Sequence, residues 1–332
     1  KTTTKELIAS VLSKKYNVWF TRGNFNNHIG VPLTLLSIPP LADIVVVEMG
    51  ANHIGEIAQL CEIALPNHGL ITNIGHAHIE GFGSIEGVMK GKGELYDFLK
   101  KNGGEIFINV DNERLMNMVG GYYPWIGYGT GEGAVVKGSH VSAKPFLKFQ
   151  LTTSRVDELP VETQLLGAYN LENALAAASV GYYFGIEETM IKEAISDYQP
   201  ANNRSQFYDT GKNKVLLDAY NANPSSMKVA LEHFKNTPHP RKILILGSMK
   251  ELGEESLQEH QCLIRRVLEL EFSSCFLTGP EFEPLVPDDH RFVWCRETQE
   301  LKKALKLVCI SDALILVKGS RANKLEEVID VL

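Results

Sequence analysis

The sequence lacks the features that mark disulfide-rich, membrane-spanning and nucleic-acid-binding proteins. Its five cysteines are odd in number and show no C-x-x-C spacing, which argues against a disulfide framework and against a zinc site. No apolar run approaches the ~20 residues that a spanning helix needs. The net charge of −7 gives no electrostatic reason to expect nucleic acid or an anionic membrane surface as a partner. We therefore expect free thiols in a reducing compartment, and local groups must hold any anionic ligand.

The pattern of short apolar runs and amphipathic stretches is that of an α/β protein with a mainly parallel sheet. A chain of 332 residues exceeds the usual size of one core, so two domains are expected. Turn residues cluster at 199–203, which places the boundary there and predicts domains at 1–201 and 202–332. Alternating polar and apolar residues at about 105–166 predict a strand-rich insert in the first domain.

Several elements can be placed from their periodicity. Helices are expected at 55–63, 85–101, 170–184 and 187–198 in the first domain. The second domain reads as a Rossmann-like unit, with strands expected at 215–217, 243–246, 275–277, 292–294 and 314–317. Polar residues follow most of these strands. Because ligands of open α/β sheets bind outside the carboxyl ends of the strands, we expect the functional residues there.

The chain opens on Lys1, Thr2 and Thr3, which read as the last third of a G-x-x-x-x-G-K-[ST] phosphate loop. In such a loop backbone N–H groups cradle the phosphates, the lysine reaches the terminal phosphates and the hydroxyl binds Mg²⁺. The glycines of the loop are absent from these residues. Lysine before threonine is common, so an unrelated helix start is an equal alternative on these residues alone.

Three further phrases carry candidate chemistry: residues 46–57, 70–84 and 91–99. Glu48 follows an apolar strand and can serve Mg²⁺, although a strand-end glutamate facing solvent is as probable. His78 lies in a glycine-rich loop, where a lone surface histidine usually has no function. Lys92 begins an amphipathic helix, where charged residues ordinarily form a solvated face.

Taken together, these phrases resemble one family, the ATP-dependent Mur ligases, over essentially the whole chain. The phrases that carry the resemblance are KTTTKE, TRGNFNNHIGVPLTLL, EMGANHIGEI, TNIGHAHIEGFGS, KGEL, GAYNLENALAA, LLDAYNANPSSM, MKELG and VKGSR. GNFNN, GANH and EGFGS are similar to the branch that joins D-alanyl-D-alanine to UDP-N-acetylmuramoyl-tripeptide. The resemblance implies a P-loop-type central ATPase domain followed by the Rossmann-like domain, and a role in bacterial peptidoglycan synthesis in the cytoplasm, as a monomer.

The resemblance also implies a mechanism. A substrate carboxylate attacks the γ-phosphoryl group of ATP, and the incoming amine then displaces phosphate from the acyl phosphate. Lys1 would reach the β- and γ-phosphates, Thr2 and Glu48 would hold one Mg²⁺, and His78 would help to bind a second. The lysine that matches Lys92 is carbamylated in the family, which turns a cation into a carboxylate-like group near the second Mg²⁺.

The remaining implied contacts concern the ligands. Thr3 would continue the phosphate site, Asn173 would contact adenine, Asp218 the ribose and Arg204 the nucleotide phosphates. The muramyl-peptide side would involve Thr21, Asn24, Asn27, Asn52 and His53. The dipeptide side would involve Asn221, Ser226, Lys318 and Arg321. Asn52 and Asn221 could instead be turn residues, and Lys318 a solvated strand end.

The sequence departs from the family pattern at Tyr169, where many relatives carry histidine, and at Ser248, where they carry aspartate. Relatives also have an N-terminal domain that binds the UDP moiety, with no counterpart here, so we expect these 332 residues alone to show little or no ligase activity. The alternatives are another Mur-type ligase, folylpolyglutamate synthase, or a non-catalytic nucleotide-binding module. The module would leave Lys92 and Lys318 without a role.

Overall fold

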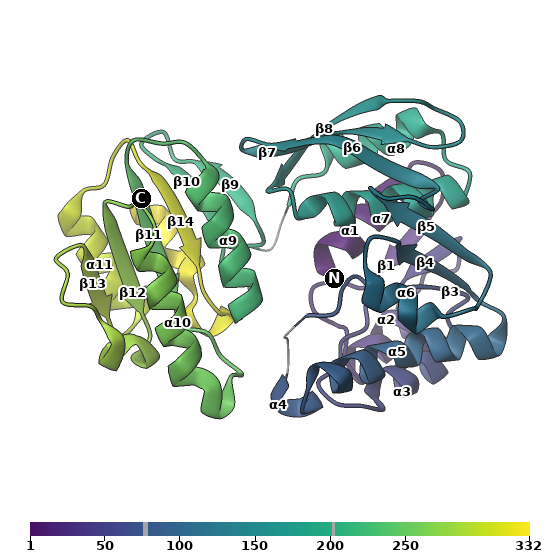
Figure 1. Ribbon diagram of the computed structural model, residues 1–332, viewed down its shortest axis with the longest axis horizontal. Coiled ribbons are helices and arrows are strands. Elements are labelled where there is room, and N and C mark those ends of the chain that lie inside the picture. The colour runs from purple at the N-terminus through teal and green to yellow at the C-terminus, as the bar shows by residue number, and fades with distance from the viewer. Residues whose placement is uncertain (76–78, 201–202) are drawn as a thin grey trace. The chain divides into compact units, whose positions relative to one another are not determined.

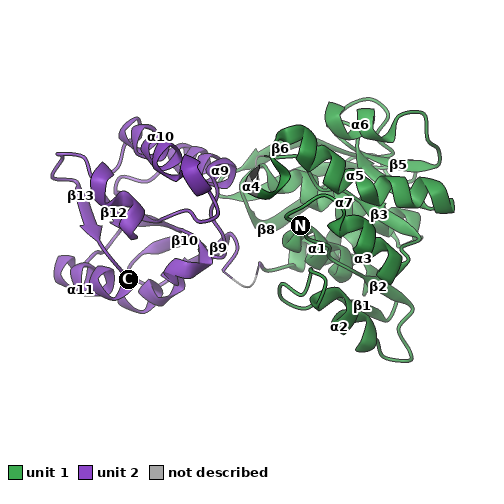
Figure 2. Cartoon of the chain, turned by 90° about the horizontal axis from the view of Figure 1, so that it is seen from below, with its two compact units in different colours: residues 1–199 green, residues 200–332 purple. Residues whose placement is uncertain are grey.

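The computed structural model describes residues 1–75, 79–200 and 203–332. The chain divides into two compact units, Lys1–Gln199 and Pro200–Leu332, which are coloured separately in Figure 2. No helix in the described part of the chain is long and apolar enough to cross a membrane. Each unit has its own sheet and its own core.

Unit 1 contains a short parallel pair and a six-stranded sheet in the order β3-β4-β5-β6-β7-β8. The strands β3 to β6 run parallel, and β7 and β8 are antiparallel to their neighbours. The strands are β1 (Val18–Phe20), β2 (Ile44–Val46), β3 (His68–Leu70), β4 (Glu105–Asn109), β5 (Trp125–Gly129), β6 (Val136–Ala143), β7 (Phe146–Thr152) and β8 (Leu159–Leu166).

The segment 105–166 is rich in strands, as predicted, but it is not a separate insert. It supplies β4 to β8 and continues the sheet that starts at β3. The reason is visible in β4, where Ile106 and Ile108 pack into one cluster and Phe107 into another. A strand that is apolar on both faces must be covered on both faces, as in parallel sheets.

Helices cover the sheet of unit 1 on both sides (Figure 1). The helices α1, α7 and α8 pack together, and α7 contacts β4, β5 and β6. The helices α5 and α6 contact β4, and α5 belongs to the other core cluster. The bounds are α1 (Thr2–Leu12), α2 (Gly30–Leu36), α3 (Glu56–Ala64), α4 (Ile79–Phe82), α5 (Ile85–Asn102), α6 (Glu113–Val119), α7 (Asn170–Tyr183) and α8 (Glu188–Asp197).

The close packing of α7 explains its alanine-rich sequence. A Cβ added at Gly181 would lie 2.4 Å from Val11 of α1 and 3.0 Å from Ile191 of α8. Small residues on α7 therefore let three helices approach one another, and this packing fixes α1, whose first turn carries the predicted phosphate-loop residues.

Unit 2 is a six-stranded sheet in the order β13-β12-β11-β14-β10-β9. All neighbours are parallel except the edge strand β9, which was not predicted. The five predicted strands are all present. The strands are β9 (Gln206–Asp209), β10 (Lys214–Asp218), β11 (Lys242–Gly247), β12 (Ser274–Thr278), β13 (Phe292–Cys295) and β14 (Leu314–Lys318).

The helices of unit 2 connect these parallel strands. They are α9 (Pro224–Asn236), α10 (Ser256–Leu268) and α11 (Thr298–Val308), with 3₁₀ turns η1 (Gly253–Glu255), η2 (Pro280–Leu285), η3 (Arg321–Asn323) and η4 (Leu325–Val331). The carboxyl ends of β10, β11, β12 and β14 lie on one edge of the sheet, because these strands run in the same direction.

The start of α9 offers a stability test. The side chain of Asn223 accepts a 2.8 Å hydrogen bond from the Ser226 N–H, and the Ser226 hydroxyl accepts one of 3.1 Å from the Asn223 N–H, which forms a capping box. We expect Asn223→Ala to lower the free energy of unfolding of unit 2 by about 1 kcal/mol. Urea denaturation measures this, with the exposed Asn236→Ala at the other end of α9 as control. Equal midpoints for the two variants would contradict the capping role.

Candidate active site

The first turn of α1 places the predicted phosphate-loop residues. Thr2 is buried, Thr3 is half-buried and Lys1 is exposed. The backbone N–H groups of a first helical turn have no partner within the helix, and the helix dipole adds positive potential. The start of α1 is therefore suited to an anion such as a phosphate.

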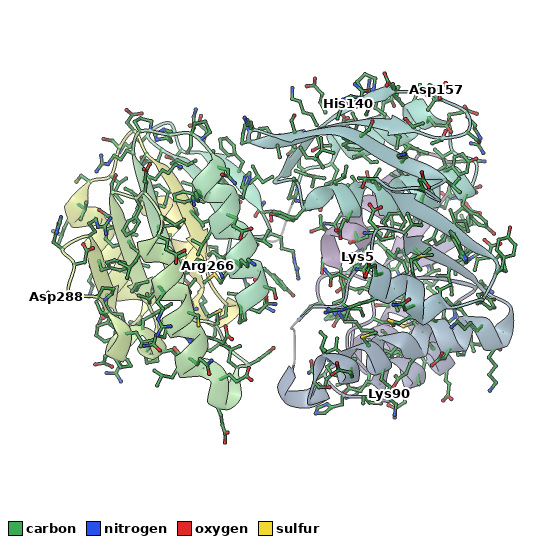
Figure 3. The ribbon with its side chains drawn as sticks, viewed as in Figure 1. Lys5, Lys90, His140, Asp157, Arg266 and Asp288 are labelled. Atoms are coloured by element: carbon green, nitrogen blue, oxygen red, sulfur yellow. The ribbon has the colours of Figure 1, made fainter. Side chains whose placement is uncertain are left out.

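A chain of hydrogen bonds ties α1 to the loops after β1 and β2. The Lys5 ammonium donates to the Thr21 carbonyl oxygen at 2.7 Å, and the Glu48 N–H donates to the Thr21 hydroxyl at 2.9 Å. Lys5 is labelled in Figure 3. The Asn26 side-chain amide donates to Glu48 Oε1 at 2.8 Å. Asn26 therefore fixes the Glu48 carboxylate just after β2, and Thr21 links the Glu48 backbone to Lys5 of α1.

One oxygen of the Glu48 carboxylate makes no hydrogen bond within the protein. Its side chain is buried, and Oε2 is enclosed with no hydrogen-bond partner. A buried carboxylate oxygen without a partner is costly, and a bound cation offsets that cost. The Thr2 hydroxyl, buried in the first turn of α1, is another hard oxygen of the kind that Mg²⁺ prefers. The residues present therefore fit a Mg²⁺ ion.

The described residues contain no group of three or more His, Cys, Asp or Glu side chains that could hold a metal ion. His78, predicted to bind the second Mg²⁺, lies outside the described residues.

Lys92 lies in the second turn of α5, half-buried, and its ammonium donates to the Asn73 carbonyl oxygen at 2.8 Å. Burial, together with the positive charge of Lys1, lowers the pKa of Lys92 from 10.5 to about 8. The electrostatic effect of Lys1 indicates that the two side chains lie near one another. Lys92 is thus not an ordinary surface lysine, because a sizeable part of its amine is neutral near pH 8.

The loop before α3 is held by two glutamates. The Glu94 carboxylate accepts from the Gly55 N–H at 2.6 Å and from the Ala58 N–H at 2.9 Å. Glu56 accepts from the N–H groups of Asn52 and His53. The predicted substrate residues Asn52 and His53 are exposed in this loop. Glu94 was not among the predicted site residues, although it lies in the KGEL phrase.

Asn173 on α7 faces α1. The Thr4 hydroxyl donates to its side-chain oxygen at 2.7 Å, and its side-chain amide donates to the Asn170 side-chain oxygen at 2.8 Å. These bonds bridge the two helices, so the predicted adenine residue lies one turn from the phosphate-loop residues.

Two residues predicted to contact substrate have their polar atoms engaged within the protein. Thr21 is fully buried, and its hydroxyl and carbonyl serve Glu48 and Lys5. The side-chain oxygen of Asn27 accepts from the N–H groups of Ile29 and Gly30 at the start of α2. Asn24 is exposed. Asn26, which was not predicted, is the asparagine of this loop that holds Glu48.

In unit 2 the structure brings Asp218 and Lys318 together. They are register partners at the carboxyl ends of β10 and β14, and they form an ion pair. Lys318 is only 1% exposed, so it is not a solvated strand end. Its ammonium also lies 3.5 Å from the Asn221 carbonyl oxygen. The family resemblance assigns Asp218 to the ribose and Lys318 to the dipeptide, and the structure shows the two side chains in direct contact.

The other predicted residues of unit 2 have varied surroundings. The Arg204 guanidinium stacks 3.6 Å from the centre of the Tyr220 ring, and its Nε is buried without a hydrogen-bond partner. Arg321 is exposed and pairs with Glu326 at 2.6 Å. The Asn221 side-chain oxygen accepts from the Ala222 N–H, as a turn residue does. Ser226 belongs to the capping box of α9.

Comparison with known families gives two matches that together cover most of the chain. The family model of the Mur ligase middle domain matches residues 1–181. The model described as Mur ligase, glutamate ligase domain, matches residues 203–321.

Among curated proteins, the chain is similar to two relatives named UDP-N-acetylmuramoyl-tripeptide–D-alanyl-D-alanine ligase. The Bacillus subtilis relative is 34% identical over 99% of this chain and 73% of its own length. The Escherichia coli relative is 34% identical over 100% of this chain and 74% of its own length.

Two solved structures share the fold. MurF from Acinetobacter baumannii has a TM-score of 0.87 at 28% identity and covers 99% of this chain and 73% of its own. The MurF ligase from Thermotoga maritima in complex with ADP has a TM-score of 0.86 at 26% identity and covers 99% of this chain and 76% of its own.

Proposed function

The chain belongs to the Mur ligase family, and we propose that it is an ATP-dependent ligase that joins D-alanyl-D-alanine to UDP-N-acetylmuramoyl-tripeptide in peptidoglycan precursor synthesis. The observation that carries the catalytic part is the Glu48 carboxylate, which is buried with one oxygen unpartnered in the loop that Thr21 links to α1. Because ATP and UDP-linked substrates are cytoplasmic metabolites, we place the reaction in the bacterial cytoplasm. We further propose a monomer, which light scattering can test.

In this proposal the first turn of α1 binds the phosphates of ATP. Lys1 reaches the β- and γ-phosphates, while Thr2 and Thr3 supply backbone N–H groups and hydroxyls. Asn173, beside Thr4, contacts adenine. Asp218 contacts the ribose and Arg204 the nucleotide phosphates; the buried, unpartnered Nε of Arg204 supports a role in binding an anion.

Thr2, Glu48, His78 and carbamylated Lys92 would hold two Mg²⁺ ions. When bound, these ions neutralise the charge that develops on the transferred phosphoryl group. The chain's own residues orient the reactants: Asn26 and Thr21 fix the Glu48 carboxylate, and the backbone carbonyl of Asn73 holds the Lys92 side chain.

The reaction we propose proceeds in two steps. The substrate carboxylate displaces ADP from the γ-phosphorus and forms an acyl phosphate, and the amine of D-alanyl-D-alanine then displaces inorganic phosphate and loses a proton. Asn24, Asn52 and His53 are exposed in loops of unit 1 and can reach the muramyl peptide. We propose structural roles for Thr21 and Asn27, because their polar atoms are engaged within the protein.

For the dipeptide, we propose contacts from Lys318, Asn221 and Arg321 of unit 2. Ser226 is a weaker candidate, because its hydroxyl already accepts from and donates to the backbone of Asn223. The ion pair with Asp218 fixes the Lys318 ammonium at the sheet edge.

A comparison of acceptors tests the function. Turnover is measured on the full-length ligase, by which we mean a chain with a complete phosphate loop and UDP-binding domain ahead of Lys1. We expect ATP-dependent phosphate release with UDP-N-acetylmuramoyl-tripeptide and D-alanyl-D-alanine. Phosphate release with a diamino acid or with glutamate, but not with D-alanyl-D-alanine, would contradict the proposal. Isothermal titration calorimetry with ATP on the 332 residues, against the full-length ligase, measures the contribution of the glycine loop.

A further inference from the structure

A fully buried histidine, His260 on α10, is hydrogen-bonded to the loop that follows β11. The ring is 0% exposed, Nδ1 lies 2.7 Å from the Ser256 carbonyl oxygen, and Nε2 lies 2.9 Å from the Met249 nitrogen. A carbonyl oxygen can only accept and a backbone N–H can only donate. The ring is therefore the neutral tautomer, with the proton on Nδ1 and Nε2 as acceptor.

This loop, residues 248–253, contains a residue with an unfavourable backbone conformation. Glu251, two residues after Met249, has φ of 64°, in the left-handed region that side chains other than glycine seldom adopt. Strain of this kind persists where the surroundings over-determine it, and it clusters at functional sites. The hydrogen bond from Met249 to the buried ring is one such constraint.

The same ring also touches the loop after β12. The Phe282 ring lies edge-on to the His260 ring, with 4.9 Å between the ring centres. Its neighbour Glu281 forms an ion pair with Lys250 of loop 248–253. The loop after β14 joins them, because the Asn323 side-chain amide donates to the Ser248 carbonyl oxygen at 2.8 Å. Three adjacent parallel strands thus end in loops that are tied together around one histidine.

We propose that His260 is a positioning residue that fixes loop 248–253 for binding of the acceptor dipeptide. The inference rests on the proposed ligase function and deepens it. Ligands of open α/β sheets bind at the carboxyl edge where these loops lie. The proposed dipeptide residues Lys318 and Arg321 lie at the end of β14 and in the loop after it, and Asn323 of that loop is bonded to Ser248 of loop 248–253. The ion pair between Lys250 and Glu281 ties the loop after β12 to the same edge.

Three charged groups influence the pKa of the ring electrostatically: Glu259 on α10 itself, Lys250 on loop 248–253 and Glu281 on η2. Burial lowers the pKa of His260 despite the two carboxylates. The lowered pKa keeps the ring neutral at pH 7, so Nε2 can accept the hydrogen bond from the Met249 N–H at that pH. Acidification protonates the ring and breaks this hydrogen bond, at a lower pH than for an ordinary histidine.

Two substitutions at this position separate packing from hydrogen bonding. His260→Phe keeps an aromatic ring against Phe282 but leaves the Met249 N–H without its partner. His260→Gln restores a donor and an acceptor. We expect His260→Phe in the full-length ligase to raise KM for D-alanyl-D-alanine by about 10-fold, with KM for ATP unchanged, and His260→Gln to recover most of it. Hydrogen exchange of residues 249–253 should rise in His260→Phe. His290→Gln, at a side chain that is 96% exposed, is the matched control.

An unchanged KM for the dipeptide, or unchanged exchange in the loop, would overturn the inference. If His260→Phe does not fold, Glu251→Gly tests the loop without altering the core, because glycine accepts the left-handed conformation and loosens the chain. It should raise the same KM, and an unaltered value would again count against the inference. A wild-type enzyme that uses no D-alanyl-D-alanine would overturn the proposed function as well, whereas wild-type turnover with an unaffected His260→Phe would overturn this inference alone.

Discussion

Replacing Glu48 with glutamine should lower kcat of the full-length ligase by about 10²–10³-fold, the loss expected when one preorganised electrostatic group of an active site is removed. The substitution preserves shape, and the new amide oxygen can still accept from Asn26. What it removes is the negative charge on the buried oxygen that has no protein partner. Steady-state kinetics over a range of Mg²⁺ concentrations measures the effect, which we expect excess Mg²⁺ not to restore.

Asn26→Ala should lower the activity less than Glu48→Gln does. The carboxylate keeps its charge but loses the amide that orients it, so the apparent Mg²⁺ affinity should fall by about 10–100-fold, as when an outer-shell partner of a metal ligand is removed. Excess Mg²⁺ should restore much of this activity. Asp43→Asn, which changes an exposed carboxylate just before β2, is the control and should behave as wild type. Equal activity of Glu48→Gln and Asp43→Asn would refute a metal site at Glu48.

The strands and the strand-end residues were predictable because each parallel strand appears in the sequence as a short apolar run that ends at a polar residue. An apolar run followed by a charged residue predicted Glu48, Asp218 and Lys318 at the carboxyl edges of their sheets. Which strand-end residues meet was not predictable. Asp218 and Lys318 are 100 positions apart in sequence, and only the strand order places β10 beside β14.

The asparagine-rich loop after β1 shows a second limit of the sequence. The GNFNN phrase predicts Asn24 and Asn27 as site residues, whereas Asn26 is the one that holds Glu48 in the structure. The choice depends on a turn fixed from outside the loop, since the Gly50 N–H donates to the Asn26 carbonyl oxygen at 2.7 Å. Asn27 meanwhile serves the start of α2, as short polar side chains often do. A polar residue in a motif can therefore satisfy the backbone rather than a ligand.

Lys92 yields a prediction that separates a modified lysine from a simple cation. Its pKa of about 8 leaves about one amine in ten neutral at pH 7, a few hundred times the fraction of an ordinary lysine. Only the neutral amine adds CO₂, forming an N–C bond and releasing a proton. At fixed dissolved CO₂, carbamate on Lys92 should therefore increase as pH rises from 7 to 9. Carbon-13 NMR after labelling with ¹³CO₂ measures the carbamate carbon directly.

Kinetics gives the matching functional result. Lys92→Ala should lower kcat of the full-length ligase by at least about 10²-fold, and short carboxylic acids such as acetate should restore part of it by replacing the carbamate oxygens. Lys92→Arg keeps a positive charge that cannot be deprotonated, so it should be as inactive as alanine and should not respond to acetate. Lys90→Ala, on the exposed side of the same helix and labelled in Figure 3, is the matched control.

The arginine variant decides between two roles for the lysine. If Lys92 acted as a cation that attracts the phosphates of ATP, Lys92→Arg would retain much of the activity, and acetate would inhibit or have no effect. The lowered pKa argues against that role, because burial and the nearby Lys1 charge both disfavour a second ammonium at this position. A site that already carries Lys1 for the phosphates gains little from another positive charge. It gains more from an anionic group that can share a divalent cation with Glu48.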